Sequence, residues 1–267
     1  MLPLVLDELV ETLQKRPKTQ SKWLPCEPTA AELKKAKQNA TDQSQFDTLG
    51  LKRGIWQQYE AGKIVLTCKC LPHARVLAFS NDGPDWDLWA RIFDWFGPSP
   101  SGKPWLVVWY AAESPRRFPS VGQELGAEHV NGGYTQYCST DGIFIYRKEE
   151  ASRVLVHEMI HATCMDDLAL SLPQREANVE TWAELILIAI LSGGSKSKAA
   201  ALWKKQAHWV SSTNHKAAAQ HGSHDETDYG WRYLNGRALM YAQLGILLPA
   251  PKAHGNSTRF THPDLAV

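Results

Sequence analysis

The sequence predicts an α+β fold, in which a small, twisted, mixed β-sheet packs on one helix and a mainly helical C-terminal lobe follows. Two observations predict this class. Short β-branched and apolar runs, bounded by turn residues, gather between residues 63 and 146, as expected for strands. From residue 149 onward, apolar residues recur every three or four positions, which is helical spacing.

The N-terminal part is expected to be helical. Residues 2–15 carry apolar side chains at helical spacing and are followed by Pro17. A second helix is expected over 29–40, because Thr29 followed by Glu32 has the pattern of a capping box. The polar residues 41–50 are assigned to no element.

The sheet is expected to come from the middle of the chain. Strands are expected over 63–68, 74–79, 104–110, 133–138 and 143–146. The last two should form a hairpin, because Ser-Thr-Asp-Gly between them is a turn signal. A Trp-rich helix over 85–96 precedes the third strand, and residues 114–126 are expected to form a loop.

The second half is expected to be helical over 149–165, 175–191, 197–210 and 231–248. The polar, His-rich residues 211–229 between the last two helices are expected to form a long loop. The expected organisation is an N-terminal helical segment (1–60), an α/β lobe (61–166), a helical C-terminal lobe (167–250) and a flexible tail (251–267).

Composition limits the classes of partner and the cellular compartment that we expect for this chain. The net charge is only +1, so no overall field favours nucleic acid or an anionic membrane. The five cysteines form no Cys-x-x-Cys pair, so we expect no disulfide framework and a reducing compartment. The chain lacks a basic leader and a long apolar stretch. We therefore expect a soluble, intracellular, cytoplasmic protein without membrane or nucleic-acid partners.

The most informative motif is His157-Glu158-x-x-His161, within the helix expected over 149–165. Histidines four residues apart share one helix face, so both imidazoles can reach one Zn²⁺ ion. Glu158 stands beside the first histidine, where it can contact a metal-bound water without being a ligand itself. A pair of core histidines bonded to carboxylates would give the same pattern without a metal.

A catalytic zinc site needs a third protein ligand and an open position for water. After His161 no histidine follows until His208, but Glu176, Glu180 and Glu184 lie four residues apart on the next helix. Such a carboxylate stripe in a largely apolar helix favours a ligand function. A partly exposed acidic face would also produce this stripe.

The complete pattern resembles the gluzincin branch of the zincin metallopeptidases, because eighteen residues separate His161 from Glu180. The resemblance implies a zincin-like fold, Zn²⁺ held by His157, His161 and Glu180, and a metallopeptidase with Glu158 as general base. It also implies that Glu184 hydrogen-bonds the first ligand histidine, His157. A peptide or protein substrate would pair with an edge strand, for which residues 133–138 are the candidate.

The sequence also departs from these families. It lacks the Gly-x-Met-x-Asn motif of aminopeptidase-N-like enzymes, and Val179 precedes Glu180 where thermolysin-like enzymes carry Asn. The His-Glu-Met-Ile-His-Ala stretch is also similar to SprT-like proteases, which cleave DNA-crosslinked proteins. Their third histidine and basic region are missing here. A noncatalytic zincin-fold binding protein is also compatible with the motif.

The resemblance implies one more group, a downstream Tyr or His that stabilises the oxyanion. Tyr229 and Tyr233 are the preferred candidates because they flank the start of the last expected helix, and His224 comes next. The less favoured candidates are His208, His215, His221 and Tyr241. Cys164 lies near the ligand face, and as a fourth zinc ligand it would make the site structural instead.

Overall fold

The computed structural model describes residues 2–16 and 21–265, which group by their contacts into two compact units. The sheet unit contains residues 21–115 and 131–165, and the helical unit contains residues 2–16, 116–130 and 166–265. The predicted α+β class is confirmed. The four consecutive segments expected from the sequence stay a prediction.

The sheet unit is built on six strands in the order β1-β2-β3-β4-β6-β5. β3, β4 and β6 run parallel, whereas the β1–β2, β2–β3 and β5–β6 pairs are antiparallel, so the sheet is mixed as predicted. The strands are β1 (Leu24–Pro25), β2 (Leu66–Leu71), β3 (Ala74–Phe79), β4 (Trp105–Ala112), β5 (Gly133–Thr135) and β6 (Ile143–Arg147).

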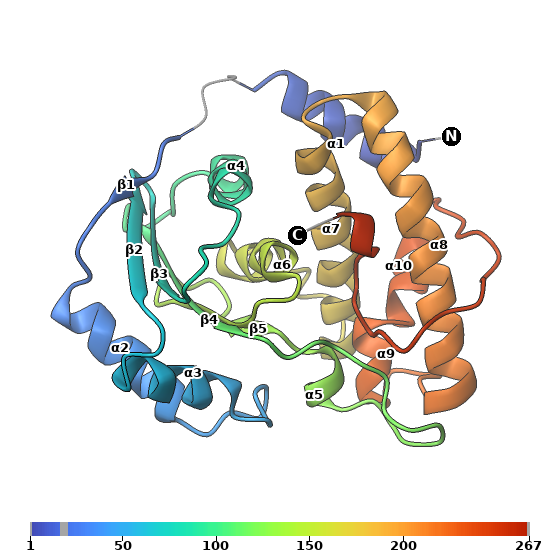
Figure 1. The fold of residues 1–267 in the computed structure, drawn as a ribbon. Coiled ribbons are helices and arrows are strands. Elements are labelled where there is room, and N and C mark those ends of the chain that lie inside the picture. The colour runs from blue at the N-terminus through green and yellow to red at the C-terminus, as the bar shows by residue number, and fades with distance from the viewer. Residues whose placement is uncertain (1, 17–20, 266–267) are drawn as a thin grey trace. The chain divides into compact units, whose positions relative to one another are not determined.

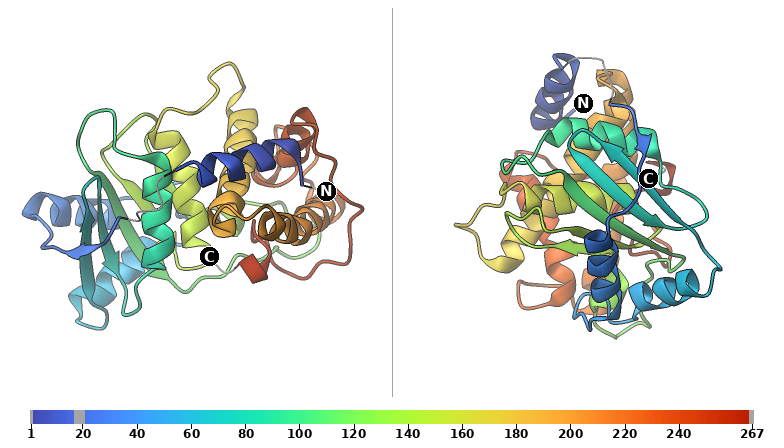
Figure 2. Two further views of the ribbon diagram at one scale, coloured as in Figure 1. Left: turned by 90° about the horizontal axis from the view of Figure 1, so that it is seen from above. Right: turned by 90° about the vertical axis from the view of Figure 1, so that its left-hand side faces the viewer.

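Helices cover both faces of this sheet (Figure 1; Figure 2). α2 (Ala30–Thr41) and α3 (Leu51–Glu60) cover one face, where Trp56 contacts Phe79 and Phe79 stacks on Tyr110. α4 (Trp86–Phe96) and α6 (Ala151–Ala162) cover the other face, where Trp89 contacts Trp109. The helix with the two histidines, α6, therefore packs on the sheet as predicted.

The helical unit is organised around α7 (Leu172–Ser192), which packs against α1 (Leu4–Gln14), α8 (Lys196–His221), α9 (Tyr229–Tyr233) and α10 (Gly236–Gln243). α5 (Ala127–Val130) and the short η1 (Pro263–Leu265) complete it. In the C-terminal segment, Thr258 N donates to Arg116 O at 3.3 Å, and the Phe260 side chain is buried.

Several elements follow the local signals of the sequence. Thr29 and Glu32 form the predicted capping box of α2, with hydrogen bonds of 3.2 and 2.7 Å. Asp85 caps α4 by accepting from Leu88 N at 2.9 Å, and Gly97 ends that helix. The predicted strand over 74–79 is β3, with the same bounds.

Two helix predictions are wrong, and α3 is a helix for which the sequence analysis gives no bounds. It lies within the segment 1–60 that is expected to be helical, and Asp47 accepts hydrogen bonds from the N–H groups of Leu51 and Lys52 at its start. α8 continues through residues 211–221, for which a loop is predicted. The final helix is two helices, α9 and α10, which are separated by a turn at Leu234 and Asn235.

Candidate metal centre

Helix α6 brings the two sequence-predicted histidine ligands together. The Nε2 atoms of His157 and His161 lie 3.0 Å apart, and their rings meet at 72°. Two nitrogen ligands about 2.0–2.1 Å from one tetrahedral zinc ion would lie about 3.3 Å from each other. The observed separation is close to that value, so the pair fits a shared metal ion.

The environment of α6 makes polar residues there costly. Eleven of its twelve residues are buried, among them His157 and Glu158, which are 6% and 4% exposed. The helix packs against α4, β5 and β6, and Trp89 Nε1 donates to Ser152 Oγ at 3.1 Å. Because buried polar groups must be paired or metal-bound, this burial favours a function for the motif over a solvated helix face.

Strand β5 lies at the sheet edge directly against Glu158. A Cβ atom added to Gly133 would lie 2.6 Å from Val154 Cγ1, 2.9 Å from Phe144 O and 3.5 Å from Glu158 Oε1. Glycine therefore allows α6 to approach the strand closely. The predicted edge strand is confirmed, but it ends at Thr135 and not at residue 138.

The opposite face of β5 borders a groove. Side chains alternate along a strand, so Tyr134 points away from α6 and toward α2 and α3. Its hydroxyl accepts hydrogen bonds from Lys52 Nζ at 2.7 Å and Asn39 Nδ2 at 2.6 Å. Tyr134 and Thr135 line a groove of about 600 Å³ together with residues of α2 and of the segment that follows it.

A disulfide between Cys138 and Cys164 joins the segment after β5 to the end of α6, with Cα atoms 4.6 Å apart. Cys138 N also donates to His161 O at 3.0 Å. The loop beyond the edge strand is thus fixed to the last turn of the histidine helix. With its sulfur bonded to Cys138, Cys164 cannot be a fourth, thiolate ligand of zinc.

A second disulfide joins Cys26 to Cys70, so the expectation of no disulfide framework is wrong. Both bridges connect cysteines that are distant in sequence, and their spacing therefore carries no signal. The inference of a reducing compartment rested on that expectation and loses its support. In the part of the chain that the structure describes, none of the helices has the length and apolar character of a membrane span.

The carboxylates predicted from the sequence lie on α7, in the helical unit. Glu180 is 3% exposed and Glu184 is fully buried. Glu184 accepts hydrogen bonds from Arg237 Nη1 at 2.9 Å and from the Tyr241 hydroxyl at 2.5 Å, both from α10. Glu184 therefore belongs to a buried ion pair within its own unit, and its predicted bond to a ligand histidine stays a prediction.

The predicted oxyanion donors occupy different environments in the helical unit. The rings of Tyr229 and Tyr233 lie 5.3 Å apart at the two ends of α9. Burial, followed by the Glu176 carboxylate, raises the pKa of Tyr233 well above its usual 10. Tyr233 therefore keeps the proton that an oxyanion donor needs. His224 is exposed at a turn, where its backbone N–H donates to Asp228 at 2.7 Å.

The less favoured donor candidates are engaged in contacts of their own or lie on α8. Tyr241 donates to Glu184, and the His221 ring stacks on Phe118 and bonds Gln123 O at 3.0 Å. His208 and His215 belong to α8, as His221 does. Tyr229 and Tyr233 also contact each other, so the preference for them as oxyanion donors stays a prediction.

Sequence reasoning did not single out Arg237. Its guanidinium is fully buried, lies 2.9 Å from Glu184 and stands over the Phe260 ring at 5.4 Å from the ring centre. A signal did exist, because Arg237 and Tyr241 are four residues apart and share one face of a helix that is otherwise rich in apolar residues.

Comparison of the chain with protein-family models, with curated proteins and with solved structures found no match. A function for this chain therefore rests on its own residues and their geometry.

Proposed function

We propose that this chain is a zinc-dependent metallopeptidase with a zincin-like fold, acting on a peptide or protein substrate. The observation that carries the proposal is the geometry of α6, where the Nε2 atoms of His157 and His161 lie 3.0 Å apart. The buried Glu158 stands between them in sequence and lies against the edge strand β5.

The donor set fits zinc. Two imidazoles on one helix face and a carboxylate are ligands that zinc accepts, and three protein ligands leave a position for water. We propose Glu180 as the third ligand, on the spacing of the sequence motif, and Glu176, one helical turn earlier on the same stripe of α7, is the second candidate. Zinc bound there would acidify its water and polarise the scissile carbonyl.

The residues of the chain supply the remaining steps. Glu158 takes a proton from the attacking water and later delivers it to the leaving amine. Tyr233 or Tyr229 donates a hydrogen bond to the developing oxyanion, for which the raised pKa of Tyr233 is suitable. The outer edge of β5 pairs with the substrate backbone, and alternate substrate side chains face the groove beside Tyr134.

The test is the variant Glu158→Gln, which keeps the size of the side chain but removes the base. We expect it to bind one zinc ion per chain, as the wild type does, and to lose hydrolysis of a peptide pool by about 10²–10⁴-fold. Glu149→Gln, just before α6, is the matched control and should keep activity. Zinc binding by the wild type without turnover would instead favour a noncatalytic zincin-fold binding protein.

The third ligand is tested by comparing Glu180→Ala with Glu176→Ala in a zinc titration. Loss of a ligand should weaken zinc binding by more than the roughly 10–100-fold typical of an outer-shell partner. We expect that larger loss for Glu180→Ala. The larger loss in Glu176→Ala would assign the ligand to the earlier turn, and no loss in either variant would contradict a carboxylate ligand from α7.

A further inference from the structure

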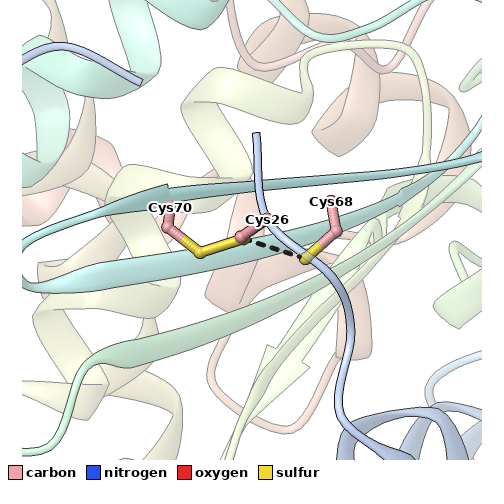
Figure 3. A group of neighbouring side chains, drawn as sticks. All are labelled: Cys26, Cys68 and Cys70. Atoms are coloured by element: carbon pink, nitrogen blue, oxygen red, sulfur yellow. Dashed lines mark hydrogen bonds between the residues drawn. A yellow bond between two sulfur atoms is a disulfide. The ribbon is translucent and has the colours of Figure 1, made fainter. Parts of the chain in front are cut away.

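Three cysteines meet at the β1–β2 side of the sheet, at the opposite end of the strand order from β5. In the antiparallel register, Leu24 pairs with Cys70 and Pro25 with Lys69, so the next residue, Cys26, stands opposite Cys68. Cys26 N donates to Cys68 O at 3.1 Å, in agreement with this register. Figure 3 shows all three side chains on one face, with Cys26 between the other two.

The disulfide does not join Cys26 to Cys68, the residue directly opposite it, but runs diagonally across the strand pair. Cys26 is bonded to Cys70, with Cα atoms 6.1 Å apart. Cys68 keeps its thiol, and its Sγ lies only 3.3 Å from Cys26 Sγ. Since Cys68 and Cys70 are two residues apart on one strand, their side chains point to the same face, and Cys26 can reach either.

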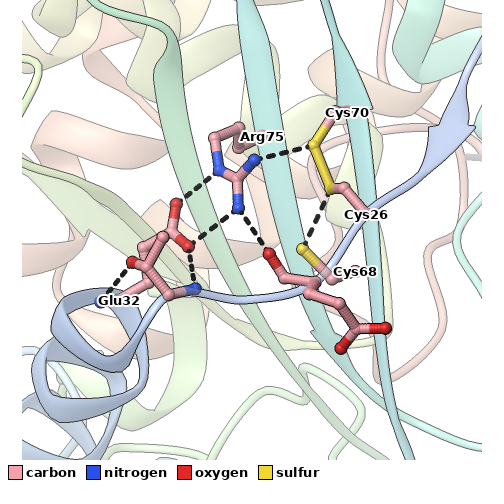
Figure 4. Close-up of a disulfide and its surroundings, with 7 residues drawn as sticks. Cys26, Glu32, Cys68, Cys70 and Arg75 are labelled. Atoms are coloured by element: carbon pink, nitrogen blue, oxygen red, sulfur yellow. Dashed lines mark hydrogen bonds and ion pairs between the residues drawn. A yellow bond between two sulfur atoms is a disulfide. The ribbon is translucent and has the colours of Figure 1, made fainter.

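The surroundings favour a thiolate at Cys70. Arg75 Nη1 donates to Cys70 Sγ at 2.9 Å, as Figure 4 shows. The guanidinium is itself held by Glu32, at 2.5 and 2.9 Å, and by Glu27 O at 2.9 Å. A fixed positive charge beside a sulfur stabilises the thiolate and makes it a better leaving group.

We propose that Cys26, Cys68 and Cys70 form an intramolecular thiol–disulfide exchange site. The Cys68 thiolate attacks Cys26 Sγ, a Cys26–Cys68 bond forms, and the Cys26–Cys70 bond breaks with its electron pair passing to Cys70. The proton of Cys68 is lost to solvent, and Arg75 stabilises the released Cys70 thiolate. One disulfide and one thiol are present before and after, so no external oxidant or reductant is needed.

The exchange changes which of the three cysteines carries the free thiol, and so how exposed that thiol is to solvent. Cys68 is buried, at 8% exposure, whereas Cys70 is partly exposed. The exchanged form therefore presents a thiolate beside Arg75 to external electrophiles and small disulfides, while β1 stays covalently attached to β2 in both forms. The site would thus be a place of thiol modification that the resting pairing protects.

The rate should depend on pH through Cys68. Burial raises the pKa of the Cys68 thiol; of the charged groups around it, Arg75 lowers that pKa, and Glu32 and Glu27 raise it. Only the thiolate attacks, so the exchange should accelerate about tenfold per pH unit while the thiol is mostly protonated.

The experiment is alkylation of the full native chain with N-ethylmaleimide, followed by peptide mapping without reduction, over time at about pH 6, 7 and 8, where thiols are mostly protonated. We expect one label per molecule in this cluster. Some molecules should carry it on Cys68 with a Cys26–Cys70 bridge, and others on Cys70 with a Cys26–Cys68 bridge. The Cys70-labelled share should rise with time and pH and should not change with protein concentration.

Two positions give the controls. Cys68→Ser should lose labelling of Cys70, because no thiol remains to release it. Arg75→Gln should lower the ratio of Cys70 to Cys68 label, and Arg75→Lys should restore part of it by keeping the charge. Label confined to Cys68 at every pH in the wild type would overturn the proposal. Labelling of all three cysteines in untreated protein would also overturn it, since the disulfide would then be absent.

Discussion

Helices α6 and α7 both carry polar side chains four residues apart in a buried setting, but they use them differently. On α6 the polar residues are two histidines whose Nε2 atoms face each other at 3.0 Å. On α7 the fully buried Glu184 is neutralised by Arg237 and hydrogen-bonded by Tyr241, both within the same unit. The same sequence spacing thus accompanies a histidine pair suited to a cation on α6 and, at Glu184 of α7, an ion pair with a residue of another helix.

The difference shows how much about function can be inferred from polar residues spaced four apart on a helix. This spacing places polar groups on one helix face, but the neighbouring elements decide whether that face binds a ligand or stabilises the fold. Changes on α6 should therefore affect metal binding and activity first, and changes around Glu184 should affect folding first. The Arg237 and zinc variants test that division directly, and two further sets, with smaller expected effects, test the packing of α6 on β5 and the burial of one tyrosine in each unit.

Removal of the Arg237 charge should lower the unfolding free energy more than any of the other changes. Arg237→Met leaves Glu184 buried without its cation, and loss of one partner of a buried pair costs about 3–5 kcal/mol of unfolding free energy. The measurement is urea denaturation of both proteins. The double variant Glu184→Gln/Arg237→Met should be less destabilised than the single one, because its buried amide is neutral. Equal losses in both variants would contradict a charge effect.

Zinc should stabilise the protein through the histidines of α6. At a free concentration about 100 times its Kd, zinc should raise the unfolding free energy by about 2.7 kcal/mol. His161→Asn should lose this gain, whereas His215→Asn, an exposed histidine on α8, should keep it. Thermal unfolding with and without zinc measures both. A gain that survives in His161→Asn would place the metal elsewhere.

The close contact between α6 and β5 predicts an effect of intermediate size. Gly133→Ala should destabilise the chain by about 1–3 kcal/mol, the usual cost of overpacking, because the new methyl meets Val154 and a backbone oxygen. Gly54→Ala in α3 is the matched control. It has open space at its Cβ and should stabilise the helix by about 0.5–1 kcal/mol. Equal changes in unfolding free energy in the two variants would show that local backbone propensity, and not packing, determines the change.

The smallest effect should appear at alkaline pH. Burial raises the pKa of Tyr110 in the sheet unit and of Tyr233 in the helical unit. Below about pH 10 both tyrosines are protonated in the folded and unfolded chain. Above it only the unfolded chain loses the protons, so the unfolding free energy should fall by up to about 1.4 kcal/mol per pH unit per tyrosine.

The variants Tyr233→Phe and Tyr110→Phe separate the two contributions. Each should flatten the fall in unfolding free energy between about pH 10 and 11, measured by urea denaturation. An unchanged slope in either variant would mean that its tyrosine ionises equally in both states.

Local signals in the sequence are sufficient for much of the fold. Capping residues such as Thr29 and Asp85 fix helix starts through hydrogen bonds to nearby N–H groups, and such contacts can be inferred from a few consecutive residues. The histidine pair also follows from local geometry, because a four-residue spacing on a helix brings two side chains together.

Features that depend on tertiary packing are not readable from the sequence. The polar stretch after residue 210 predicts a loop, but Ser212 and Thr213 donate to the carbonyls of His208 and Trp209 and so remain satisfied within α8. The Cys26–Cys70 bridge depends on the register of a two-residue strand. The partner of Glu184 comes from another helix, for which a single sequence carries no distance information.

The interleaving of the two units has a consequence for how the chain folds during synthesis. The sheet unit is complete once residue 165 has left the ribosome. Leu6 and Val10 of α1, by contrast, belong to a core cluster with Leu185 of α7 and Ala199 of α8, which are translated much later. The apolar face of α1 can therefore be buried only after residues 185–199 have been translated, although α1 is the first helix to be synthesised.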